Sequence, residues 1–430
     1  MIGQSSIRHP FACRNDVPGG NNLVLGWENK LADTVSENKM PANEIQSPRG
    51  GRGRRLYGKC RMTTALCWGT RTVRTLVFVS AGLLGAATAL PCTTFLLEGE
   101  GRLYFGRNLD WGWEDGLVIL NQRNVRKTAL VASGHSPAQW TSKYGSVTFN
   151  QFGREKPFGG MNEAGLVVEQ MMLMESRYPA VDSRPEIDAL QWIQYQLDNC
   201  RSVAEVVATD GKIRLEQPTV PARVHYLVCD ARGDCAAIEF LEGAMVCHQG
   251  QTLPCRALAN DSYEQAVAFA RAHPEPEVTA GRLKDAPSLA RFSRAATRAA
   301  RFHPATSQQD LEYAFETLEQ VRQGGATVWQ IVYDVSARQI HYRTRSSPRL
   351  RLVDLKALDF SCARPVEFLD IQTGPSPTGR LEFQNLSETR HRTYLEGFFA
   401  QESLKRALGD LTPTIEATLR ALRGYACGDR

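Results

Sequence analysis

The chain has 430 residues, 42% hydrophobic and 23% charged, which is typical of a globular protein with a sizeable core. This balance excludes a fibre and a wholly disordered chain. The formal charge of +5 is uneven, because residues 1–91 carry 12 Lys and Arg against 5 Asp and Glu, leaving 39 against 41 for the rest. Residues 92–430 are therefore slightly acidic, which argues against nucleic acid as a partner.

An apolar run over residues 75–90 follows Arg71 and Arg74 and includes an A-x-A pattern at residues 87–89. A basic flank, a short apolar core and A-x-A in this order are typical of a secretory signal peptide. A transmembrane anchor is the alternative, but the run is short, rich in Gly and Ala, and has no stop-transfer flank. We therefore expect an exported protein, periplasmic or extracellular.

The 61 residues before Met62 are too many for the basic start of a signal peptide. We expect translation to start at Met62, so that residues 62–91 are the signal peptide with a short pro-segment. Residues 1–61 would be a non-structural or wrongly included lead. Residues 92–362 would form the main domain. Residues 363–430 start Pro/Gly-rich and are predicted to end in a helix over Thr393–Arg423, packed on the main domain or on another subunit.

The pattern is rich in strands from Cys92 onward. Strands are predicted at residues 93–98, 102–107, 144–150, 165–171, 224–229, 235–240, 328–334 and 338–343. Amphipathic helices are predicted around residues 190–197, after the capping box at 202–205, and over 311–321. The predicted strands form hairpins, and the predicted helices lie in separate blocks of the sequence. This order favours an α+β fold, with antiparallel sheets covered by helices, over a doubly wound sheet.

Export implies an oxidising compartment, so disulfides are expected among the cysteines. Cys229 and Cys235 flank one short turn, and Cys247 and Cys255 flank another. Each pair is a candidate for a hairpin disulfide, and free buried cysteines are the alternative.

Most standard catalytic motifs are missing. There is no Walker loop, G-x-G-x-x-G, H-E-x-x-H or C-x-x-C, and the eight histidines are scattered singly, so no metal or organic cofactor is expected. The segment Gly134-His-Ser-Pro-Ala138 is similar to the turn that carries a nucleophilic serine, which makes Ser136 a rival nucleophile. It lacks the final glycine, the preceding apolar strand and the following helix of that motif.

Cys92 lies three residues after the A-x-A pattern. Removal of Leu90 and Pro91 would give Cys92 a free α-amine beside its thiol. An α-amine titrates near pH 8, so much of it is neutral at working pH and accepts the thiol proton without a histidine. A lipid-modified cysteine is one alternative, although Pro91 does not fit the small residue required before it. An ordinary structural cysteine is the other.

Three ordered segments point to one family: Cys92-Thr-Thr-Phe95, Phe105-Gly-Arg-Asn-Leu-Asp-Trp111 and Gly159-Gly-Met-Asn-Glu-Ala-Gly-Leu-Val-Val168. Together they resemble the choloylglycine hydrolase family, which includes bile salt hydrolases and penicillin V acylases. The resemblance implies a four-layer αββα sandwich of the N-terminal-nucleophile hydrolase type, with residues 92–362 as the amidase catalytic domain. It also implies a homo-oligomer, a tetramer in this family.

The resemblance also implies roles for individual residues. Cys92 would open the mature chain as the nucleophile. Arg107 would favour its thiolate and Asp110 would hold its α-amine. Asn260, in Leu-Ala-Asn-Asp-Ser, corresponds to an asparagine that binds the oxyanion, and Arg291, in Ala-Arg-Phe, corresponds to a family arginine.

One position departs from the pattern of bile salt hydrolases. They typically have asparagine ten residues after the asparagine of N-E-x-G-L, where penicillin acylases tend to have tyrosine; here it is Met172. Its backbone N–H is still expected to complete an oxyanion hole. The run Met171–Met174 predicts an apolar acyl pocket, to which Trp111 and Trp113 would add aromatic surface.

We therefore predict a secreted cysteine amidase that cleaves a linear carbon–nitrogen amide through a thioester on Cys92. A small acylated substrate of the penicillin V or acyl-homoserine-lactone type is favoured over conjugated bile salts. The alternative from a different functional class is a secreted, lipid-anchored binding protein acylated at Cys92.

Overall fold

The computed structural model describes residues 92–430 except 133–134, 218–222, 274–287, 377–380 and 429–430. The predicted lead (1–61) and signal peptide (62–91) lie outside the described residues. Within the described part of the chain, no helix has both the length and the apolar character needed to cross a bilayer.

The first of two large sheets carries Cys92 directly before one of its strands. All neighbouring strands in it are antiparallel. The strands follow the order β14 (Ala257–Leu258), β1 (Thr93–Gly99), β2 (Arg102–Asp110), β15 (Thr327–Asp334), β16 (Gln339–Thr344) and β17 (Arg351–Asp354). A two-residue turn joins β1 to β2, and both of its residues, Glu100 and Gly101, have positive φ, the geometry that matches the twist of a hairpin.

The second large sheet is also antiparallel throughout. Its strands follow the order β13 (Ala244–Gln249), β12 (Cys235–Leu241), β11 (Val224–Cys229), β8 (Val167–Met172), β7 (Pro157–Asn162), β6 (Ser146–Asn150), β3 (Leu117–Asn121), β18 (Glu367–Asp370) and β19 (Gln384–Asn385). Two small sheets accompany it, one of β9 (Glu186–Ile187) with β10 (Arg214–Leu215), and one of β4 (Val125–Thr128), β5 (Gln139–Thr141) and β20 (Ala426–Cys427).

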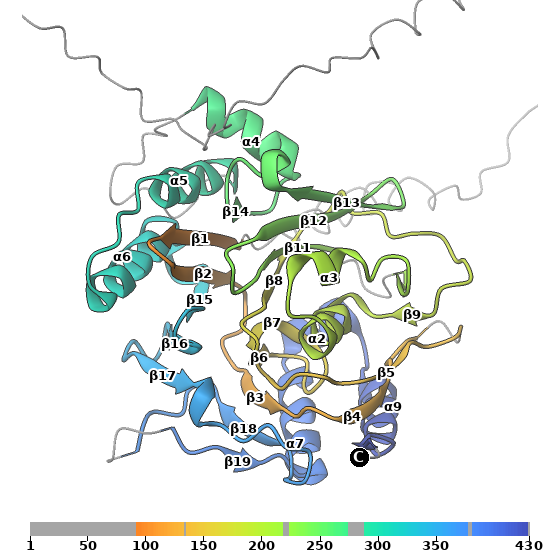
Figure 1. The fold of residues 1–430 in the computed structure, drawn as a ribbon. Helices are drawn as coiled ribbons and strands as arrows, with labels where there is room; N and C mark the ends of the chain where they lie inside the picture. The colour runs from red at the N-terminus through yellow and green to blue at the C-terminus, as the bar shows by residue number, and fades with distance from the viewer. Residues whose placement is uncertain (1–91, 133–134, 218–222, 274–287, 377–380, 429–430) are drawn as a thin grey trace, which may run out of the picture. The chain divides into compact units, whose positions relative to one another are not determined.

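Helices cover the outer face of each large sheet (Figure 1). The first sheet is covered by α4 (Tyr263–Ala272), α5 (Ser288–Ala300) and α6 (Ser307–Gln320), and the second by α2 (Ala189–Asn199) and α3 (Val203–Val207). The inner faces pack on each other through aromatic side chains; the Phe149 ring lies 6.3 Å from the Tyr333 ring and 5.4 Å from the Tyr342 ring. The predicted α+β, four-layer αββα sandwich is therefore confirmed.

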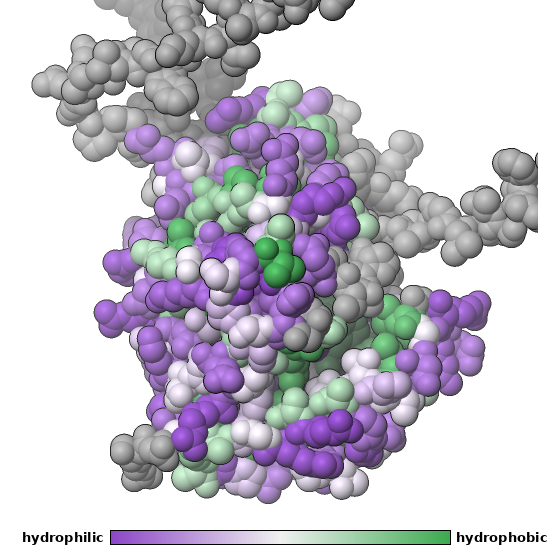
Figure 2. All heavy atoms as spheres, turned by 90° about the vertical axis from the view of Figure 1, so that its right-hand side faces the viewer, coloured by the Kyte–Doolittle hydropathy of each residue, from purple (hydrophilic) through white to green (hydrophobic). Residues whose placement is uncertain are grey.

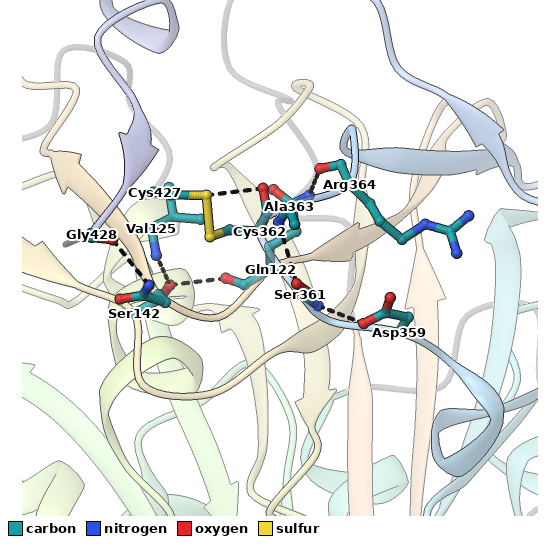
Figure 3. Close-up of a disulfide and its surroundings, with 11 residues drawn as sticks. Gln122, Val125, Ser142, Asp359, Ser361, Cys362, Ala363, Arg364, Cys427 and Gly428 are labelled. Atoms are coloured by element: carbon teal, nitrogen blue, oxygen red, sulfur yellow. Dashed lines mark hydrogen bonds between the residues drawn. A yellow bond between two sulfur atoms is a disulfide. The ribbon is translucent and has the colours of Figure 1, made fainter. Parts of the chain in front are cut away.

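The C-terminal segment is built into the catalytic domain. Its strand β18 pairs with β3 of the second sheet, and β20 pairs with β4. A disulfide between Cys362 and Cys427, which the sequence did not reveal, joins the start of this segment to its end beside β4 (Figure 3). These contacts hold β18 and β20 against strands of the N-terminal half of the described chain.

The single helix predicted over Thr393–Arg423 is wrong. Three helices occupy this region, namely α7 (Glu388–Phe399), α8 (Glu402–Leu408) and α9 (Thr412–Leu422). Gly409, with a φ of 76°, ends α8, and Pro413 lies in the first turn of α9. A left-handed glycine and a proline are the usual residues at these two helix boundaries, so the breaks have a local cause.

The two predicted hairpin disulfides have different outcomes. Cys229 and Cys235 are bonded and close the turn between β11 and β12. Cys247 has a free thiol, so the bond between Cys247 and Cys255 is wrong, although Cys255 is itself disulfide-bonded. Cys247 lies on β13, whose residues follow the pairing with β12 rather than the short turn that the sequence suggested.

Hydrophilic residues dominate the face of the molecule in Figure 2, and hydrophobic residues on it form small separate groups. The exposed large hydrophobic side chains among the described residues are Met174, Val181, Leu350 and Leu352. Scattered apolar residues are ordinary on a protein surface, so they identify no docking face. The homo-oligomer stays a prediction.

Candidate active site

The strand register brings Cys92 to Asn260. Thr94 pairs with Leu258 and Phe95 with Ala257, so the same antiparallel register continued by two residues sets Cys92 opposite Asn260. The Cys92 nitrogen donates a hydrogen bond to Asn260 Oδ1 at 2.6 Å. The cysteine is 2% exposed, and its sulfur lies 3.9 Å from the main-chain oxygen of Asp110.

Arg107 reaches the same point from β2. Its Nε lies 3.1 Å from Glu169 Oε2, and neither terminal nitrogen has a hydrogen-bonding oxygen or nitrogen in the described residues. Burial raises the pKa of the Cys92 thiol, and the Arg107 charge, together with a hydrogen bond to the sulfur, opposes that rise, while Asp110 adds to it. Among these groups, Arg107 most strongly opposes the effect of burial on the pKa of the Cys92 thiol.

Asp110 is a buried carboxylate beside the sulfur. The Thr327 hydroxyl donates to Asp110 Oδ1, while Oδ2 has no hydrogen-bond partner among the described residues. Burial raises the pKa of Asp110 to about 6, although Thr327, Arg291 and Arg107 each lower it. The Cys92 nitrogen bonds to Asn260 rather than to Asp110, so the role of Asp110 in holding the α-amine stays a prediction.

Asn260 connects the remaining site residues. Its Nδ2 donates to the Met172 main-chain oxygen at 2.9 Å, and its Oδ1 accepts from Arg291 Nη2 at 3.1 Å as well as from Cys92. Arg291 also donates from Nε to Thr93 Oγ1 at 3.0 Å. An amide nitrogen carries two hydrogens, so Asn260 retains one donor beyond its bond to Met172.

A buried histidine and glutamate hold the chain on both sides of Asn260. His225 Nε2 donates to the Ala259 oxygen at 2.8 Å, and its Nδ1 lies 3.1 Å from Glu239 Oε1. The same Glu239 oxygen accepts from the Tyr263 backbone N–H at 2.9 Å. Because both flanks are fixed to one dyad, the Asn260 side chain is held in place relative to Cys92.

The two predicted pocket tryptophans follow Asp110 directly. The Trp111 ring lies 5.6 Å from that of Trp113 and 6.0 Å from that of Phe158. Trp113 turns toward the C-terminal helices, where its Nε1 donates to Ser403 Oγ at 3.2 Å and its ring lies 6.5 Å from that of Phe398. Aromatic surface therefore runs from the residue beside the site to α7.

The methionine run does not form one continuous surface. Met171 and Leu173 are fully buried, Met172 is half-buried, and Met174 is exposed. Met171 and Met172 are neighbours on β8 and so point to opposite faces of the sheet, and the strand ends at Met172. Only Met172 of this run contacts Asn260, through its backbone oxygen.

The structure thus gathers all five residues predicted to be catalytic, Cys92, Arg107, Asp110, Asn260 and Arg291, around one sulfur. Sequence reasoning missed Glu169, which pairs with Arg107, and Thr327, which donates to Asp110. It also missed Tyr333, whose hydroxyl donates to Glu169. Glu169 did leave a signal, because it is the one charged residue in the mostly apolar strand segment from Val167 to Met172.

We expect Thr327→Val to move the acid limb of the pH profile. The valine keeps the shape but removes the hydroxyl that stabilises the Asp110 carboxylate, so the acidic midpoint of kcat/KM should rise by about one pH unit. Thr344→Val is the control, because this buried threonine bonds to Gln372 instead. An acid limb that is the same in Thr327→Val and the parent would contradict the assignment.

Comparisons with known proteins agree with this geometry. The family model for linear amide C-N hydrolases, choloylglycine hydrolase family, matches residues 92–368. A penicillin V acylase from Pectobacterium atrosepticum is 32% identical over 193 residues, which are 39% of this chain and 49% of that protein. The match thus spans about half the length of this curated relative.

Solved structures show the same fold. Penicillin V acylase from Agrobacterium tumefaciens aligns with a TM-score of 0.57 and 25% identity, over 65% of this chain and 91% of that one. A variant of conjugated bile acid hydrolase from Clostridium perfringens aligns with a TM-score of 0.52 and 17% identity, over 69% of this chain and all of that one. With the family model matching from Cys92 through both sheets, the chain belongs to the choloylglycine hydrolase family of linear amide carbon–nitrogen hydrolases.

Proposed function

We propose that the mature protein begins at Cys92 and hydrolyses the amide bond of a small acylated substrate through a thioester on that residue. The observation that carries the proposal is the meeting of a buried thiol, a guanidinium whose charge acts on that thiol and a side-chain amide at the start of β1. These are the nucleophile, the thiolate-stabilising cation and the oxyanion donor that acyl transfer requires.

In the proposed reaction, the Cys92 thiol gives its proton to its own neutral α-amine. The thiolate attacks the carbonyl carbon, and the oxygen becomes an oxyanion that accepts from the second Asn260 Nδ2 hydrogen and from the Met172 backbone N–H. The carbon–nitrogen bond then breaks, and the leaving nitrogen takes the proton from the ammonium. Water attacks the remaining thioester, which releases the acid and restores the thiol.

An apolar acyl group fits the residues around this point. Met172 carries no polar side-chain group to pair with a hydroxylated substrate, and Trp111, which follows Asp110 directly, packs against Trp113 and Phe158. These residues favour an aryl- or fatty-acyl amide, of the penicillin V or acyl-homoserine-lactone type, over a conjugated bile salt. The similarity to two penicillin V acylases supports the same choice.

The rival functions fit these surroundings less well. Acylation of Cys92 in a lipid-anchored binding protein gives no role to Arg107 and Asn260, which lie beside this cysteine. Ser136, the rival nucleophile, is exposed, and the three-residue strand β5 follows it in place of a helix. The family segments and these neighbours of Cys92 therefore favour the amidase.

A substrate panel tests the proposal. Protein secreted by an exporting host is checked by intact mass for an N-terminal Cys92 and is then given penicillin V, acyl-homoserine lactones and glycine-conjugated bile salts. We expect kcat/KM for one of the first two classes to exceed that for bile salts by at least about tenfold. Preference for bile salts would reject the substrate assignment. No turnover by protein that starts at Cys92 would reject the amidase.

A further inference from the structure

Glu169 is a second buried carboxylate of the site, and the proposed reaction gives it no part. It is 1% exposed and lies on β8 of the second sheet, whereas Arg107 lies on β2 of the first. Its Oε2 is 3.1 Å from Arg107 Nε, and its Oε1 accepts a hydrogen bond from the Tyr333 hydroxyl. The carboxylate thus joins the two sheets directly behind the arginine that faces Cys92.

The Glu169 carboxylate occupies space that a side chain at position 159 would fill. Gly159 pairs with Glu169 across β7 and β8, and a Cβ at position 159 would lie 2.0 Å from the Glu169 carboxyl carbon. On the other side, β11 places the uncharged Leu227 opposite Glu169. The charged or titratable groups that face the carboxylate are therefore Arg107 from β2 and Tyr333 from β15.

Two anions share one cation here. Arg107 binds Glu169 through Nε, and its charge also interacts with the Cys92 thiol. A guanidinium that is already neutralised by a carboxylate stabilises a nearby thiolate less than an unpaired one does. The charge on Glu169 therefore bears directly on how easily Cys92 ionises.

We propose that Glu169 is a positioning residue that aims Arg107 at Cys92, and that its carboxylate competes with the thiolate for the Arg107 charge. Geometry and charge thus act in opposite directions. The side chain at 169 is needed to hold the guanidinium in place, but its negative charge makes the thiolate harder to form. This inference rests on the proposed use of Cys92 as the nucleophile.

The carboxyl group of Glu169 changes its charge near neutral pH. Burial raises the pKa of Glu169 to about 7, against the lowering effects of Arg107 and Tyr333. Below that pH the carboxyl is neutral and leaves the Arg107 charge to Cys92; above it, the ion pair is complete. The site would therefore favour the thiolate most strongly on the acid side, where the thiol alone ionises least.

Alkylation by iodoacetamide tests the charge effect without any amide substrate. The rate is measured across pH on the peptide that contains Cys92, by mass spectrometry, so that the free thiols of Cys200 and Cys247 do not contribute. We expect Glu169→Gln, which keeps the shape and removes the charge, to lower the midpoint by about one pH unit. An unchanged or higher midpoint would overturn the competition.

Two further variants serve as a check and a control. Tyr333→Phe removes one stabilising donor from the carboxylate, so the midpoint should shift in the same direction by less. Glu163→Gln is the matched control, because Glu163 pairs with Arg123 at 3.2 Å at the turn between β7 and β8. Its midpoint should equal the parent value, and a shift as large as that of Glu169→Gln would count against a specific effect.

Steady-state kinetics test whether Glu169 positions Arg107. Glu169→Ala frees Arg107 to move, so kcat should fall by about 100-fold with little change in KM, whereas Glu169→Gln should retain most of kcat. Equal losses in both variants would overturn the positioning role. A parent enzyme that cleaves no amide would reject the proposed function but leave the alkylation result interpretable.

Discussion

Cys92→Ala should lower kcat for amide hydrolysis by at least about 10⁴-fold. The substitution removes the only sulfur that contacts Asp110 and interacts with Arg107 in the described part of the chain, so no thioester forms. The alanine leaves the α-amine, Asn260 and Arg291 in place. Substrate binding should therefore persist, and the loss should appear in kcat measured by release of the amine product.

Cys247→Ala and Ser136→Ala are the controls for this result. Cys247 is a half-buried free thiol on β13, and Ser136 lies on an exposed segment. Both variants should keep the parent kcat. Full activity in Cys92→Ala, with activity lost in Ser136→Ala, would establish the serine as the nucleophile instead.

The second large effect is expected from Asn260→Ala. This change removes the acceptor for the Cys92 nitrogen and the nitrogen that we assign to the oxyanion. Loss of one oxyanion donor costs about 10²- to 10³-fold in kcat, so that loss is expected here with KM nearly unchanged. Asn260→Asp keeps the acceptor and loses the donor, and it should lose nearly as much kcat.

Asn199→Ala controls for the removal of a side-chain amide. Asn199 donates to the Tyr195 oxygen at the end of α2, on the outer layer of the second sheet. Its kcat should match that of the parent, and thermal unfolding should confirm that both alanine variants fold. A higher KM with an unchanged kcat in Asn260→Ala would assign Asn260 to substrate binding rather than to the oxyanion.

Local chemistry made several features predictable. The hairpin of β1 and β2 follows from two short apolar runs on either side of Glu100 and Gly101, whose positive φ values suit a two-residue turn. Cys229 and Cys235 are close in sequence and lie at the facing ends of paired strands. Their disulfide could therefore be predicted from one hairpin alone. Each of these depends on neighbours within a few residues.

The site was predictable in part, and only through resemblance. Arg107 and Asp110 lie in the segment that carries the likeness, and Asn260 and Arg291 in short matching contexts. By composition alone, Arg291 belongs to an ordinary charged helix stripe, and Asn260 to a turn. That all four converge on Cys92 depends on the pairing of β1 with β2 and β14 and on the packing of α5.

The sequence by itself indicated the α+β class, because hairpin patterning is a local property of the chain. It made Cys92 the predicted nucleophile only through the segments that carry the family resemblance. Only the tertiary structure decided that Glu169 pairs with Arg107 and accepts from Tyr333, that Cys247 is free, and that Cys427 bonds to Cys362. The physical reason is that these contacts join different sheets or distant segments. A partner across the interior is chosen by packing and burial, and no spacing along the chain encodes it.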